Sequence, residues 1–135
     1  FPNEQASLHV LSRDQERQKH GILGLIITFL CKLYDATHED SFLSNAKSYM
    51  RFLQDMHPST FEDEVSGYVA WGAASLAFAT KNEALLDVSI QATNQLLSRF
   101  ESLKQDLESL SFRDCKKIAE FGICVNEVQA LICRM

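Results

Sequence analysis

The stretch that decides the fold is STFEDEVSGYVAWGAASLAFAT, residues 59–80. Ser59 and Glu62 form a Ser-x-x-Glu capping box, which is a sequence signature of a helix N-terminus. Behind this start, small residues recur at three- and four-residue intervals, at Gly67, Ala70, Ala74 and Ala77. Small side chains let the backbone of a neighbouring helix approach closely. The stretch therefore predicts a helix at the centre of a bundle.

The composition agrees with a helical domain. The 135 residues suffice for one domain, which at this size buries about two thirds of the surface that the unfolded chain exposes. Hydrophobic residues make up 46%, and five Gly and two Pro leave few turn-forming residues. We expect one all-α domain over residues 1–135, a compact bundle or short array of about five helices. Residues 1–15 are expected to form an arm or a short helix, and the start at Phe1 fits either a processed protein or a fragment.

Four further helices are predicted from apolar periodicity and capping residues. The first, residues 14–35, is apolar on nearly every side and is expected to be wrapped by neighbours. The second follows a box at residues 37–40 and ends near residue 57, and the fourth follows a box at residues 80–83. This long fourth helix is expected to reach Leu110 and to pack against a C-terminal helix that starts after the Ser111 cap and continues to the end of the chain.

The fourth and fifth helices offer more apolar surface than a small bundle requires. In the fourth, a seven-residue repeat joins Leu86, Thr93, Phe100 and Leu107, next to Ser89, Leu96, Leu103 and Leu110. We predict a non-enzymatic protein–protein interaction module or scaffold, a subunit or domain of a larger intracellular complex, with homo- or hetero-oligomers both open. The predicted partner-binding residues are Leu96, Phe100, Leu103, Leu107, Leu110, Val128 and Ile132.

Charge and motifs argue against several other functions. A net charge of −5 repels nucleic acid, and the apolar run at residues 22–34 is too short to span a bilayer and contains Lys32. Gly-rich phosphate loops, nucleophile elbows and His-Glu-x-x-His motifs are missing from the sequence. We therefore predict no catalytic residues, no cofactor, no metal, no nucleic acid and no membrane span. A pocket for an apolar small molecule beside the small residues of the third helix is a weaker alternative.

The cysteines bear on the compartment. Cys115, Cys124 and Cys133 follow one another at nine-residue intervals in one predicted helix, where nine residues rise about 13 Å, too far for a disulfide. Only Cys31 could pair with one of them. Reduced thiols and the lack of Asn-x-Ser/Thr sites favour an intracellular protein. The alternative is a secreted or host-directed helical-bundle ligand or effector with Cys31 bridged to a late cysteine.

One segment supports a family comparison. Val69-Ala-Trp71-Gly72, followed by Phe78, resembles the BH1 region of Bcl-2-like proteins, where a Trp-Gly pair opens a central helix that lines a groove. The resemblance ends with Phe78, and it departs at Ala73, where the family has an Arg that pairs with its peptide ligand. The resemblance implies that the secreted or host-directed effector could be a remote Bcl-2-like protein that binds a peptide in its groove. The apolar residues around Trp71 in the sequence instead favour a position in the core.

Overall fold

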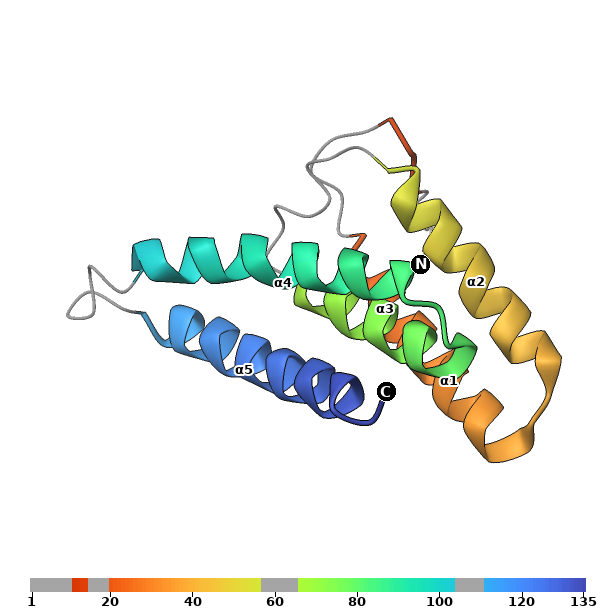
Figure 1. Ribbon diagram of the computed structural model, residues 1–135. Helices are drawn as coiled ribbons and strands as arrows, with labels where there is room; N and C mark the ends of the chain where they lie inside the picture. The colour runs from red at the N-terminus through yellow and green to blue at the C-terminus, as the bar shows by residue number, and fades with distance from the viewer. Residues whose placement is uncertain (1–10, 15–19, 57–65, 104–110) are drawn as a thin grey trace, which may run out of the picture.

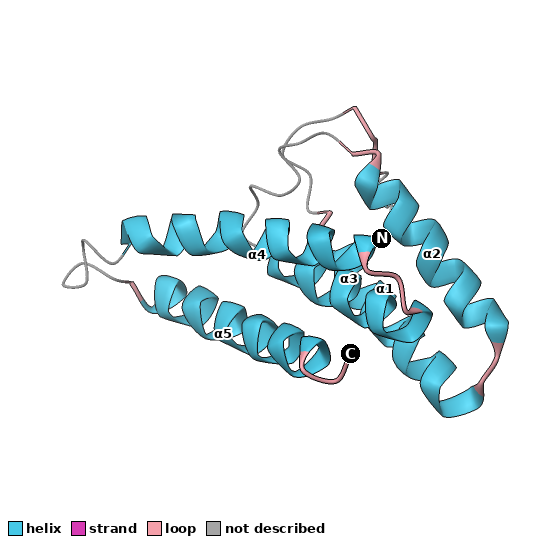
Figure 2. Cartoon of the chain, viewed as in Figure 1, coloured by secondary structure: helices cyan, strands magenta, loops and turns pink. Residues whose placement is uncertain are grey.

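The computed structural model describes residues 11–14, 20–56, 66–103 and 111–135. These residues form five helices and no strand (Figures 1 and 2). The helices are α1 (Ile22–Thr37), α2 (Asp40–Gln54), α3 (Ser66–Thr80), α4 (Ala84–Leu103) and α5 (Phe112–Ile132). The predicted all-α bundle is therefore confirmed.

The predicted central helix is α3. It contacts each of the other four helices, and α1, α4 and α5 all pack more closely on α3 than on one another. Figure 1 shows α3 in green between the orange α1 and the blue α5, with α4 crossing beside it. The helix that carries the small residues thus organises the bundle.

The backbones of α1 and α3 meet at two glycines, Gly24 and Gly72. A β-carbon at position 24 would overlap the backbone carbonyl of Tyr68, and one at position 72 would lie 2.7 Å from the carbonyl oxygen of Gly24. Real β-carbons essentially never approach other atoms this closely. The crossing of α1 over α3 therefore requires glycine on both helices.

The buried side chains form two clusters. The larger one joins α1, α2, α3 and the start of α4 through Leu23, Ile27, Cys31, Ala46, Met50, Leu53, Val69, Ala73, Leu76, Ala77 and Leu85. The smaller one joins α3, α4 and α5 through Ala70, Ala74, Ala92 and Val128. A buried hydrogen bond adds to the second cluster, because the Ser89 hydroxyl donates to the Ala70 carbonyl at 2.8 Å. The core of α4 and α5 is thus built largely from small residues.

The N-terminal part of the chain differs from the expectation. The first helix begins at Ile22 after the N-cap Gly21, not at Asp14. The intervening sequence, residues 14–19, is DQERQK and offers no apolar side chain to a core. Before it, the Arg13 guanidinium lies over the ring of Phe52 at 5.5 Å and pairs with Asp55 at 3.6 Å, so residues 11–14 are attached to α2.

The outer side of α1 also differs from the expectation. Ile22 and Phe29 are 56% and 61% exposed, and Ile26 between them is exposed as well. These residues share one side of the helix by their three- and four-residue spacing, opposite the buried Leu23 and Ile27. Among the described residues, α1 packs on α2 and α3, and its third side has no helix against it.

Two of the predicted capping boxes are wrong. Thr37 and Thr80 end α1 and α3, and each hydroxyl donates to the carbonyl four residues earlier, at 2.8 and 2.7 Å. The next residues, His38 and Lys81, both have φ of 57° and turn the chain out of the helix. The amide of Ala84 instead donates to the Asn82 side chain at the start of α4.

The predicted Ser111 cap at the start of α5 is confirmed, and the structure extends it to a capping box. The Ser111 hydroxyl accepts from the Asp114 amide at 3.3 Å, and an Asp114 carboxylate oxygen accepts from the Ser111 amide at 3.0 Å. α5 ends at Ile132, before the predicted end at the last residue. The predicted box at Ser59 lies outside the described residues.

Candidate functional site

The candidate site lies along the line where α4 and α5 face each other. The rings of Phe100 on α4 and Phe121 on α5 stack with centroids 4.5 Å apart and planes inclined by 20°. The predicted packing of the fourth helix on the C-terminal helix is confirmed at this pair. Elsewhere both helices pack mainly on α3, and Figure 1 shows them running beside each other.

Large apolar residues with exposed surface flank the stacked rings. On α4, Ile90 and Leu97 lie on the side of Phe100 by their three- and seven-residue spacing, and they are 46% and 42% exposed. On α5, Ile118 lies three residues before Phe121 and Ile132 lies eleven residues, about three turns, after it, so both share its side of the helix. They are 37% and 40% exposed. We name this surface the α4–α5 seam, formed by Ile90, Leu97, Phe100, Ile118, Phe121 and Ile132.

The residues predicted to bind a partner fall into three groups. Leu96 and Val128 are buried against α3, Leu96 near Gly67 and Val128 in the smaller cluster, so the structure places both in the core. Phe100 is half-buried and Ile132 is exposed, and both belong to the α4–α5 seam. Leu107 and Leu110 lie outside the described residues, and for Leu103 only the backbone is described.

Four members of the seam were not predicted from the sequence: Ile90, Leu97, Ile118 and Phe121. Ile90 and Leu97 repeat at seven residues directly beside the line of Ser89 and Leu96. The sequence contains this repeat, but the repeat of Leu96, Leu103 and Leu110 has more leucines and was therefore predicted to be the binding surface. The structure shows that the line of Ser89 and Leu96 faces α3 and leaves the neighbouring line uncovered.

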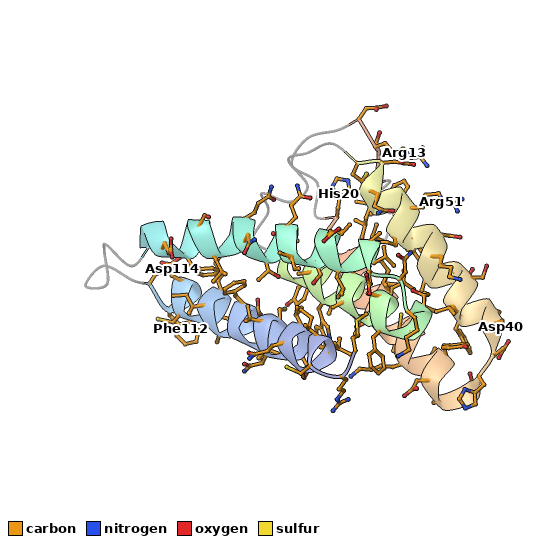
Figure 3. The ribbon with its side chains drawn as sticks, in the orientation of Figure 1. Arg13, His20, Asp40, Arg51, Phe112 and Asp114 are labelled. Carbon is orange, nitrogen blue, oxygen red and sulfur yellow. The ribbon has the colours of Figure 1, made fainter. Side chains whose placement is uncertain are left out.

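The start of α5 adds one further exposed apolar residue. Phe112, the first residue of the helix, is 88% exposed. Figure 3 shows Phe112 at the outer end of α5, near Asp114, away from the core. Its spacing from Phe121 places it on the opposite side of α5, so it does not belong to the seam.

The two buried thiols of the bundle are poor nucleophiles. All four cysteines are free, with Cys31 and Cys124 buried and the other two exposed. Burial raises the pKa of Cys31 to about 12. Burial, followed by the negative charge of Glu120, raises the pKa of Cys124 to about 11. Both buried thiols therefore keep their protons at neutral pH, and the bridge from Cys31 to a late cysteine is not formed.

Tyr68 lies beside the same acidic residue. Its pKa is raised by burial first and then by the charges of Glu120 and Cys124. The described residues contain no group of His, Cys, Asp or Glu that could hold a metal ion.

Within the described ranges, each helix falls short of the length and apolarity needed to cross a lipid bilayer. Compared with protein families, with curated proteins and with solved structures, the chain matches none.

Proposed function

We propose that the chain is a non-enzymatic module that binds another protein through the α4–α5 seam. The observation that carries the proposal is the set of four large aliphatic side chains, 37–46% exposed, on either side of the Phe100–Phe121 stack. Contiguous exposed apolar surface on a folded protein is typical of an interaction site. The aromatic pair gives such a surface a rigid centre, which is where binding energy concentrates in protein interfaces.

The shape of the seam favours a helical partner. α4 and α5 both pack on α3 and contact each other at the Phe100–Phe121 pair. They therefore present two neighbouring rows of aliphatic side chains. An amphipathic helix with apolar residues at three- and four-residue intervals can lie along such rows. The four free thiols support an intracellular setting for this complex, because thiols persist in reducing compartments.

The test compares matched charge insertions on two surfaces. Leu97→Glu and Ile118→Glu place a charge in the seam, whereas Tyr49→Glu places one at a 39% exposed residue of α2, which contacts neither α4 nor α5. Partners captured by the wild-type chain from its native source are quantified for each variant, with circular dichroism as a check of folding. We expect one partner to be lost in both seam variants and retained with Tyr49→Glu.

Two results would contradict the proposal. Capture that survives both seam substitutions in folded protein would remove the seam from binding. Equal loss of the partner with Tyr49→Glu would show that the charge, and not the seam, governs capture.

A further inference from the structure

A second surface lies on the side of α3 between α1 and α5. Tyr68, Trp71 and Phe78 share this side by their three- and seven-residue spacing, and all three are half-buried. In the described part of the chain α1 and α5 both pack on α3 without contacting each other, so they border these rings. We name the three residues the aromatic face of α3.

Two lysines hold their charges over this face. The Lys32 ammonium lies 5.7 Å from the ring centroid of Trp71, and the Lys81 ammonium lies 4.6 Å from that of Phe78. Ring faces attract cations, so each ammonium has a favourable place on the aromatic surface. Neither lysine forms an ion pair with any other described residue. The face therefore combines apolar rings with two positive charges over Trp71 and Phe78, while the negative charge of Glu120 acts on Tyr68 at its other end.

The spacing of the two rings beneath these charges indicates the kind of partner. Trp71 and Phe78 are seven residues apart, which corresponds to about 10.5 Å along a helix. Two carboxylates seven residues apart on another helix have the same separation. From this match we propose that the aromatic face of α3 docks an amphipathic helix of a second protein, with one carboxylate near Lys32 and the other near Lys81. Apolar residues between the carboxylates would contact Trp71.

This interface is separate from the α4–α5 seam and does not depend on it. The two charges lie on α1 and on the residue after α3, whereas the seam is formed by α4 and α5. Complementary charges at the ends of an apolar stripe fix the register of a bound helix and exclude helices with the opposite charges.

Trp71 makes the proposal directly testable, because it is the only tryptophan of the chain and its fluorescence reports the surface itself. The probe is a synthetic helical peptide with a leucine stripe and glutamates at two positions seven residues apart. The matched control peptide has lysines at those two positions. We expect a saturable change of Trp71 emission with the glutamate peptide and at least tenfold weaker binding of the lysine peptide. Lys32→Glu, an exposed substitution, should abolish the preference, because each peptide then meets one like and one opposite charge.

Controls separate this proposal from the proposed function. Leu97→Glu in the seam should leave the titration unchanged, and loss of the titration in that variant would overturn the inference by placing the peptide on the seam. Equal binding of the two peptides, or no saturation with either, would also overturn it. So would a wild-type dimer in sedimentation that Lys32→Glu dissociates, because the occupant would then be a second copy. Lys81→Glu should likewise abolish the preference and replaces Lys32→Glu if that variant does not fold.

Discussion

Gly24→Ala tests the backbone crossing on which the bundle is built. The added β-carbon would overlap the Tyr68 carbonyl on α3, and ordinary contact begins only at 3.4 Å. The obstacle is backbone within a helix, which cannot turn away as a flexible side chain can. α1 must therefore move away from α3 and loosen the buried packing of Leu23 and Ile27.

The magnitude follows from two opposing effects. Overpacking a closely packed core typically costs about 1–3 kcal/mol, and a clash against backbone belongs at the upper end or beyond. Alanine in place of glycine within a helix returns about 1 kcal/mol through its helix propensity. We expect the free energy of unfolding to fall by at least about 2 kcal/mol, the difference between the upper end of the first effect and the second.

Gly122→Ala supplies the matched control. Gly122 lies within α5, and a β-carbon there would have no neighbour within 4 Å. Only the propensity effect remains, so this variant should gain about 0.5–1 kcal/mol. Urea unfolding followed by far-ultraviolet circular dichroism measures both variants. A Gly24→Ala protein that is stabilised as much as Gly122→Ala would refute the close crossing of α1 and α3.

Two further predictions concern the cap of α5 and the buried thiols. Ser111→Ala removes the hydroxyl that accepts from the Asp114 amide and should lower the free energy of unfolding by about 1 kcal/mol in urea titrations, with no change expected if the capping box is not formed. The Cys31 thiol ionises near pH 9.0 in the unfolded chain and near 12 in the folded one. Between these values the unfolded state binds fewer protons, so stability should fall with rising pH by up to about 1.4 kcal/mol per pH unit. Cys31→Ala should flatten this slope, and an unchanged slope would contradict the assignment to Cys31.

Local sequence patterns predicted the parts of the fold that depend on local chemistry. The ridge of small residues placed α3 at the centre, because only small side chains permit close contact with several helices at once. The cap at Ser111 was also predictable, because its hydroxyl and the Asp114 carboxylate satisfy amides within the same turn. Thr37 and Thr80 misled the prediction because a threonine hydroxyl can equally donate to the carbonyl four residues earlier and remain in the preceding helix.

The candidate site was only partly predictable, because periodicity does not say what a helix face meets. A seven-residue repeat shows that Leu96 shares a line with Ser89, but which neighbour covers that line depends on the whole bundle. Here α3 covers it through the contact at Ala70, and Leu97 remains exposed one line further round. The exposed side of α1 was not predictable for the same reason, because the sequence around Phe29 does not show how many helices pack around α1.

The contact surface of α3 has a thermodynamic consequence. Glycine and alanine have no rotamers to lose on burial, whereas a long side chain loses up to about 2 kcal/mol of conformational freedom when it is fixed. Docking α1 against Gly72 and α5 against Ala70 and Ala74 therefore orders few side chains on the α3 side of either contact. These contacts therefore lose less free energy to side-chain entropy than contacts made by long side chains would. This gain offsets part of the small area that each glycine or alanine buries.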